Sequence, residues 1–259
     1  MKTKYSKYFV FCKYNDRILN IVKFLQKTEY FVFEILCIRK MEAFIKKVKK
    51  AHPLSWYRPG KTITVTDSMA MHTSMHAKYT YTLSEPPGKH FAKGFRPYSS
   101  PAKMLRQGVF EGKYLNDGTK EFPREWYEGI IKYKKIKFGP DGKSVADPKL
   151  NAFGIKSRLS IKEWRRRKWI PITEGDRDVR GWFQWYCRYW IGRRMPDVDK
   201  VQIARWKAFV RHQGQILASY RKLRSNKLRS KKPKTIAEKR KHRPKQRQAL
   251  LQWAYNPYI

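Results

Sequence analysis

The sequence predicts a mainly α-helical protein: a tryptophan-cored helical domain, with a small β-hairpin-like segment before it and a basic C-terminal arm ending in a docked helix after it. Six of the nine tryptophans lie between residues 160 and 218, and apolar rings recur there at helical spacing. Strand-like alternation of β-branched and aromatic residues is confined to two short runs, residues 61–66 and 78–83. Helices therefore account for most of the expected fold.

Shifts in composition divide the chain into five stretches. We expect residues 1–50 to be a basic, aromatic N-terminal extension outside the core. Its first forty residues fit either a segment upstream of a start at Met41 or a transit peptide, although transit peptides are usually poor in acids. The other stretches are a strand and loop segment (51–98), a helical core domain (99–218), a basic flexible arm (219–247) and a C-terminal helix packing on the core (248–259).

The elements before the tryptophan-rich stretch have clear start and stop signals. The two alternating runs are expected to pair as a hairpin. Ser100 is a typical N-cap residue, Pro101 a typical first helical residue and Gly108 a typical stop, so a short helix is predicted between them. Pro123 then begins a second short helix that carries Trp126.

Three helices are predicted within the tryptophan-rich stretch. The segment Ser160–Glu163 has the pattern of a capping box and begins the first. Residues 180–191 are apolar on two faces, which is typical of a helix buried on both sides, so this helix is the expected centre of the core. From Val198 to Leu217, apolar residues follow one helical stripe and predict a single amphipathic helix about 30 Å long.

The end of the chain combines a cationic run with an apolar helix. Residues 219–247 contain fourteen Lys or Arg and one acid, Glu238. Such a run is expected to be mobile in the free protein. Leu250, Leu251 and Trp253 then predict an amphipathic helix that docks on the core.

The charge of the chain points to a polyanionic partner. The formal net charge is +40, and self-repulsion of this size weakens a fold unless an anion relieves it. Nucleic acid, DNA or RNA, is the leading candidate, and an anionic membrane surface is the second. No run of eighteen apolar residues predicts a transmembrane helix.

The three cysteines, Cys12, Cys37 and Cys187, are not spaced as a zinc site and suggest free thiols in a reducing, intracellular compartment. That compartment can be nuclear, nucleoid or organellar. No cofactor and no bound metal is expected.

Arginine and lysine between the tryptophans are the predicted phosphate contacts. Cations at helix ends suit contacts that position a protein on nucleic acid, and a tryptophan beside them suits stacking on an unpaired base. The expected nucleic-acid-binding residues are Arg165, Arg166, Arg167, Lys168, Arg188, Arg193, Arg194, Lys207, Arg211, Trp164 and Trp169.

A nucleic-acid-processing or modifying enzyme, such as a nuclease or glycosylase, is the alternative. Glu111, Asp117 and Glu121 form a cluster of carboxylates close in sequence, suitable as metal ligands or as a general base. His212 is a further candidate base. The competing interpretation makes Asp117 a turn residue and the two glutamates ion-pair partners. The nucleotide-binding loops and nucleophile motifs of common enzyme classes do not occur in the sequence.

Three segments carry a resemblance to known sequences: 108–114 (GVFEGKY), 180–189 (RGWFQWYCRY) and 247–255 (RQALLQWAY). With them, the chain from Ser99 to Ile259 resembles a family of uncharacterised basic, tryptophan-rich hypothetical proteins. The resemblance assigns no functional residue. It implies that the first hundred residues are the variable part.

Overall fold

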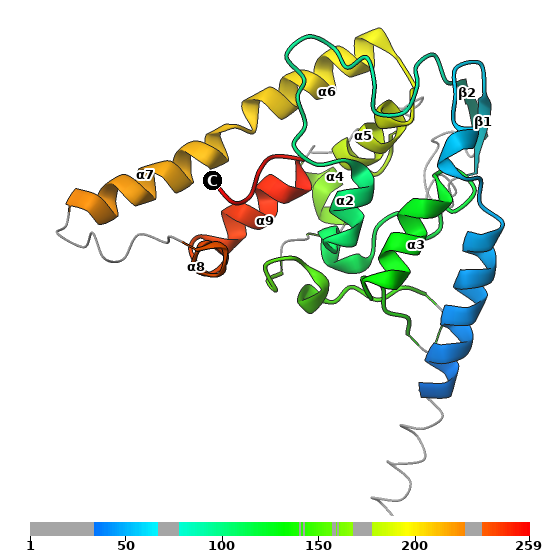
Figure 1. The fold of residues 1–259 in the computed structure, drawn as a ribbon, viewed down its shortest axis with the longest axis horizontal. Coiled ribbons are helices and arrows are strands. Elements are labelled where there is room, and N and C mark those ends of the chain that lie inside the picture. The colour runs from blue at the N-terminus through cyan, green and yellow to red at the C-terminus, as the bar shows by residue number, and fades with distance from the viewer. Residues whose placement is uncertain are drawn as a thin grey trace, which may run out of the picture. The chain divides into compact units, whose positions relative to one another are not determined.

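The structure is a computed structural model that describes residues 34–66, 78–139, 141, 143–156, 159, 161–167, 178–225 and 235–259. It confirms a mainly α-helical fold with one small antiparallel hairpin (Figure 1). It also confirms a tryptophan-rich cluster of rings. The chain forms two compact units, residues 1–45 with 138–143, and residues 46–137 with 144–259. The elements below belong to the second unit unless stated otherwise.

The smaller unit contains the first part of a helix that spans residues 34–49. The Phe44 ring packs against the Phe138 ring, with 5.5 Å between the centroids. The half-buried Cys37 donates a hydrogen bond from its thiol to the Phe138 carbonyl, at 3.3 Å.

The two alternating runs form the predicted hairpin. Strand β1 (Thr62–Thr66) pairs with β2 (Lys78–Thr82) in antiparallel register, with Thr62 opposite Thr82. On one face Ile63, Val65 and Tyr81 are buried, whereas threonine hydroxyls on the other face meet in pairs at 3.2 Å. The period of two in the sequence therefore reflects one buried and one exposed face.

Two short helices follow, as the start and stop signals predict. Helix α2 (Pro101–Arg106) has Ser100 as N-cap, whose hydroxyl accepts from the Lys103 amide at 3.3 Å. Gly108 ends this segment in the left-handed conformation, at φ +72°. Helix α3 (Arg124–Lys132) packs against α2. Short 3₁₀ turns lie at Leu54–Trp56 (η1), Val109–Gly112 (η3) and Pro148–Leu150 (η4).

Helix α5 (Trp182–Trp190) lies within the ring cluster, as its two apolar faces predict. Every residue from 182 to 189 is buried. The rings of Trp182 and Trp185 contact Tyr186 and Tyr189 respectively, with centroids 5.1 and 5.0 Å apart. Phe95 adds an edge-on contact to Trp206 at 4.9 Å. A preceding helix, α4 (Ile161–Arg166), matches the helix expected after the capping box, whose Ser160 lies outside the described residues.

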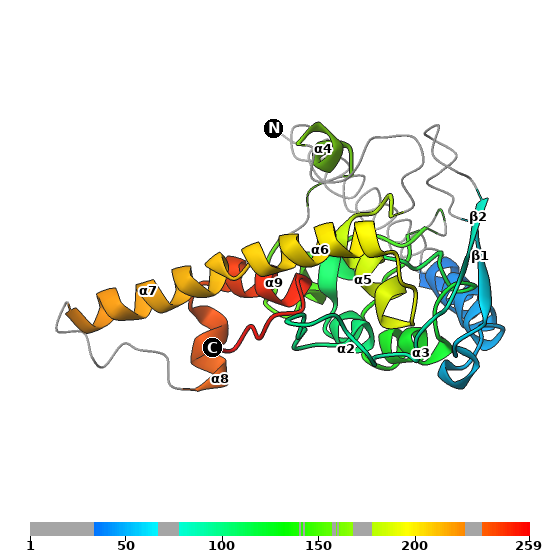
Figure 2. The same ribbon diagram turned by 90° about the horizontal axis from the view of Figure 1, so that it is seen from above.

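The long amphipathic helix is divided in two, which corrects the prediction. Helix α6 (Pro196–Ala208) is followed after Phe209 and Val210 by α7 (Arg211–Ser225), and Figure 2 shows one continuing nearly in line with the other. Val210 and Leu217 are about half exposed, at 50% and 48%, whereas Ile216 is buried. The break lets the Phe209 ring stack on Trp253 at 4.5 Å, and it changes the face that α7 buries.

The C-terminal segment packs on α7, as expected for a docked helix. Helix α8 (Ile236–Lys241) begins with a complete capping box, and α9 (Pro244–Gln252) packs against α7. Arg247 is fully buried and donates to the carbonyls of His242 and Pro257, at 2.7 and 2.5 Å. The expected arm at 219–247 is thus partly ordered: its first residues belong to α7 and its last to α9, while 226–234 lie outside the described residues.

Gly192 provides a test of how the hairpin segment is attached to α5. Its carbonyl accepts from the amides of Ser84 and Glu85, and a Cβ here would lie 1.9 Å from the Glu85 carbonyl oxygen, at φ +116°. We expect Gly192→Ala to lower the free energy of unfolding by more than about 2 kcal/mol. Chemical denaturation measures the change.

Gly214→Ala is the matched control. This glycine lies inside α7, where a Cβ atom would have no neighbouring atom within 4 Å. Because alanine is the better helix former, this variant should gain about 0.5–1 kcal/mol. Equal effects of the two substitutions would contradict the close approach at Gly192.

Candidate functional site

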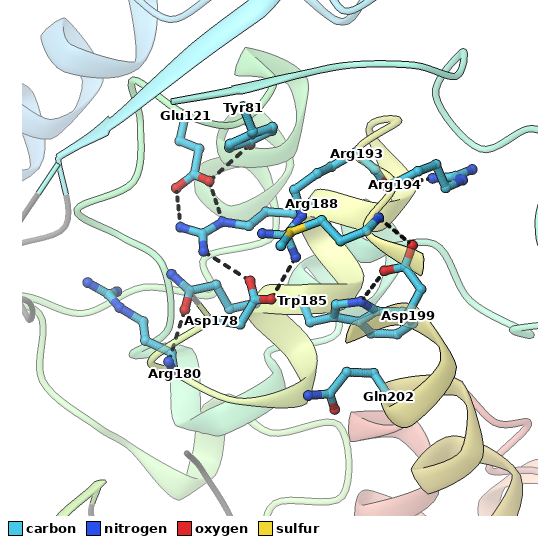
Figure 3. A network of polar contacts seen from close by, with 12 residues as sticks. Tyr81, Glu121, Asp178, Arg180, Trp185, Arg188, Arg193, Arg194, Asp199 and Gln202 are labelled. Carbon is cyan, nitrogen blue, oxygen red and sulfur yellow. Dashed lines mark hydrogen bonds and ion pairs between the residues drawn. The ribbon is translucent and has the colours of Figure 1, made fainter. Parts of the chain in front are cut away.

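Two of the predicted phosphate-binding arginines lie inside the protein in a network of ion pairs. Arg188 on α5 donates to Glu121, at 2.5 and 3.1 Å, and to Asp178 at 3.0 Å. Arg193 donates to the second oxygen of Asp178 at 2.6 Å. Tyr81 donates from β2 to Glu121 at 3.0 Å, so that hairpin, loop and helix meet at these charges (Figure 3).

The burial of this network corrects the prediction for Arg188 and Arg193. The two residues are 0% and 1% exposed, so neither guanidinium reaches solvent. Burial alone would raise the pKa of Asp178, but Arg193 and Arg188 outweigh it and hold that pKa below its usual value. The four side chains form a neutral internal cluster and are not available to phosphate in this structure.

The other predicted cations have different surroundings. Arg166 and Arg167 are exposed, but both bind Glu163. The hydrogen bonds that Glu163 accepts, first from Arg166 and next from Arg167, lower the pKa of its carboxyl to about 2. Arg194 is half-buried, donates to the Tyr189 carbonyl at 2.6 Å and lies over the Tyr189 ring. Lys207 and Arg211 are exposed.

The predicted stacking residues are only partly described. Trp164 is half-buried, and its ring contacts Phe110 edge-on at 6.0 Å. The Arg165 side chain, Lys168 and Trp169 lie outside the described residues. Among the described residues of the predicted binding surface, few cations therefore face solvent without an acidic partner.

The three carboxylates proposed for catalysis do not form one group. Asp117 is paired with Arg180, at 2.6 and 2.7 Å, and Glu121 with Arg188. These two acids line a cavity of about 40 Å³, which Glu111 does not line. Among the described residues, no three His, Cys, Asp or Glu side chains are grouped to hold a metal ion. The ion-pair interpretation of Glu121 is thus the one that the geometry favours.

The candidate base His212 is half-buried, and the Cys187 thiol is fully buried. His212 stacks on the Phe209 ring at 4.0 Å, and burial lowers its pKa; Arg211 also acts to lower it, while a hydrogen bond to the Phe209 carbonyl opposes the change. Cys187 is fully buried, and burial raises the pKa of its thiol well above the usual value. A thiol held in its protonated form is a poor nucleophile.

A different feature, a cationic depression, is the strongest candidate site. It has a volume of about 680 Å³ and is bordered by α2, the end of α3, η4 and α8. None of the described side chains that line it is acidic. Its five basic residues are Lys103, Arg106, Lys135, Lys149 and Arg240, and the remaining lining residues include Gln107, Tyr133, Asn151 and Tyr258.

Three of the five cations of the depression make local contacts. Lys103 lies over the Tyr98 ring at 4.4 Å, and Arg240 over the Tyr258 ring at 5.9 Å. Lys135 donates to the Leu150 carbonyl at 3.1 Å. Burial lowers the pKa of Lys135, and the nearby charge of Arg240 lowers it further. Positive groups therefore repel one another here, and a bound anion would relieve that repulsion.

Sequence reasoning missed the depression because its cations are far apart in the chain. They come from positions between 103 and 240, on separate elements that meet only in the folded protein. The Lys-rich connector at 131–159 supplies Lys135 and Lys149, which is the one signal that could have drawn attention to it.

The chain matches no protein-family model, no curated protein and no solved structure. The resemblance to a basic, tryptophan-rich family therefore stays a prediction. In the part of the chain that the structure describes, none of the helices combines the length and the apolar composition needed to cross a membrane.

Asp178→Asn tests the buried network. It leaves Arg188 and Arg193 without their shared carboxylate, so we expect a loss of about 3–5 kcal/mol in the free energy of unfolding at pH 7. Because the folded-state pKa of Asp178 is lowered, its contribution is present above pH ~4 and is lost as the pH falls through the folded-state value. The difference from wild type should therefore shrink at acid pH, as denaturation at several pH values would measure.

Glu128→Gln is the control, because Glu128 is about half exposed and pairs with Arg124 at 3.4 Å on the surface of α3. Its effect should stay within about 0.5 kcal/mol. A loss of similar size for Asp178→Asn and Glu128→Gln would contradict the role given to the network.

Proposed function

We propose that this protein binds nucleic acid, DNA or RNA, through phosphate contacts in the cationic depression. The observation that carries the proposal is the convergence of five lysine and arginine side chains, without a described acid among the lining residues, in a chain of net charge +40. A nucleic acid carries a phosphate at each nucleotide, and Lys and Arg are residues that contact phosphate.

The distribution of charge supports a polyanionic partner. The buried network is neutral within itself, with two arginines against Glu121 and Asp178, so it removes nothing from the positive excess of the chain. Exposed cations on α6 and α7, including Lys207 and Arg211, add to the field around the protein. Such a field attracts a polyanion from a distance and accelerates its association.

The concave shape of the site favours a nucleic acid over an anionic membrane. A membrane presents a flat layer of headgroups, which amphipathic basic helices contact with an exposed apolar face. The depression is instead a hollow lined by cations from several elements. The acidic residues do not favour the alternative of a nucleic-acid-processing enzyme, because Asp117 and Glu121 are already paired with arginines.

The proposal predicts a steep dependence of affinity on salt. If all five cations neutralise a phosphate, the logarithm of affinity should fall with the logarithm of salt concentration with a slope of about −3.5 to −4.5. Replacing Lys103 and Lys149 together by glutamine should make this slope shallower by roughly 1.5–2. Fluorescence anisotropy with a labelled oligonucleotide, between 50 and 300 mM salt, measures both slopes.

The double variant Lys93→Gln with Lys200→Gln is the matched control. It removes the same charge from exposed positions that do not line the depression. Its slope should change by less than about 0.5. An affinity of the wild-type protein that is independent of salt would remove nucleic-acid binding as the function.

A further inference from the structure

Two tyrosines lie among the cations of the depression, and their surroundings differ. Tyr258 is half-buried, and its ring is contacted by Phe153, with centroids 5.9 Å apart, as well as by Arg240. Tyr133, just after α3, is 53% exposed. Among the described residues, no ring or cation contact holds the Tyr133 side chain. An aromatic face is thus open to solvent beside groups suited to phosphate.

An exposed ring next to cations is the arrangement that proteins use for unpaired nucleotides. Cations track the backbone, and a base stacks on the aromatic side chain irrespective of its sequence, because each base has a π-face. In a duplex the bases are already stacked on one another. Tyr133 could therefore contribute stacking to a single strand, but not to an intact double helix.

The size of the depression supports the same distinction. A volume of about 680 Å³ lies within the range of pockets that enclose small ligands. A double helix is a stiff rod that such a pocket cannot enclose. A single strand is flexible enough to place one nucleotide inside it.

We propose, on the basis of the nucleic-acid binding argued above, that the depression holds one unpaired nucleotide of a single strand, DNA or RNA. Its phosphate lies among Lys103, Lys135 and Lys149, and its base stacks on Tyr133. The half-buried ammonium of Lys135 gains an anionic partner in this arrangement, which offsets the repulsion from Arg240. The preferred partner is therefore single-stranded nucleic acid.

The experiment compares a labelled single-stranded oligonucleotide with the duplex of the same sequence, using the full chain at low salt. We expect the wild-type protein to bind the single strand more tightly, by at least tenfold. Tyr133→Leu, which removes the ring, should weaken single-strand binding about 5- to 150-fold and leave duplex binding unchanged. Tyr133→Phe, which keeps a ring, should retain the wild-type affinity for the single strand.

Fluorescence of 2-aminopurine in the single strand gives a second readout that a change in folding does not mimic. Stacking on Tyr133 should quench it on binding to the wild-type and Tyr133→Phe proteins, and less on binding to Tyr133→Leu. Because Tyr133 is exposed, all three proteins should have the same melting temperature.

The two proposals fail in different ways. Equal, salt-dependent affinity for single strand and duplex, with no effect of Tyr133→Leu, would overturn the unpaired-nucleotide site and leave nucleic-acid binding standing. Failure to bind either form at low salt would overturn both proposals. A loss that is equally large for Tyr133→Phe and Tyr133→Leu would also reject stacking, because the ring would not be the group that matters.

Discussion

The pairing of Arg188 and Arg193 with Glu121 and Asp178 is the constraint on which the rest of the structure depends. Burying charges is unfavourable unless each has a partner and its hydrogen bonds are made. Here Asp178 lies between two guanidinium groups, and Glu121 binds Arg188 through both oxygens. Because Tyr81 from the hairpin also donates to Glu121, one cluster fixes β2, the loop before α3 and both ends of α5 relative to one another. A shift of any of these elements would leave a charge buried without its partner.

The outside of the molecule is cationic because the chain has 60 Lys and Arg against 20 Asp and Glu, and the neutral buried pairs leave that excess in place. Glu121 and Asp178 are paired with arginines within the core. Asp199 is also buried, and it accepts hydrogen bonds from Trp185 and from the Met195 amide at the start of α6. The half-buried Glu163 is in turn bound by Arg166 and Arg167. Few acids are left to neutralise lysines on other surfaces, and the depression between α2, η4 and α8 is one place where cations meet without them.

Local patterns in the sequence predicted the elements, whereas contacts between distant residues were not predictable from it. The hairpin, the Ser100 cap and the helix at 182–190 depend on neighbours in the chain, and each has its own signal. The burial of Arg188 does have a signal in the sequence, because a helix that is buried on both faces buries its arginine too. The long helix divides near Phe209, whose ring stacks on Trp253, forty-four positions away, and no spacing rule shows such a contact. The depression draws its cations from positions 103 to 240, so it exists only once the chain is folded.

Holding these cations together has an energetic consequence that links the core to binding. Helices α2 and α3 pack on each other and thereby bring Lys103, Arg106 and Lys135 to one site, although the charges repel. The cation–ring contacts of Lys103 and Arg240 and the hydrogen bond of Lys135 offset part of this repulsion, and the packing of the surrounding elements offsets the rest. A ligand that neutralises the cations binds a site already formed and loses little to rearrangement. It also stabilises the folded state by mass action, since the unfolded chain has no such site. Under the proposed function, affinity and stability thus depend on the same unneutralised positive charge.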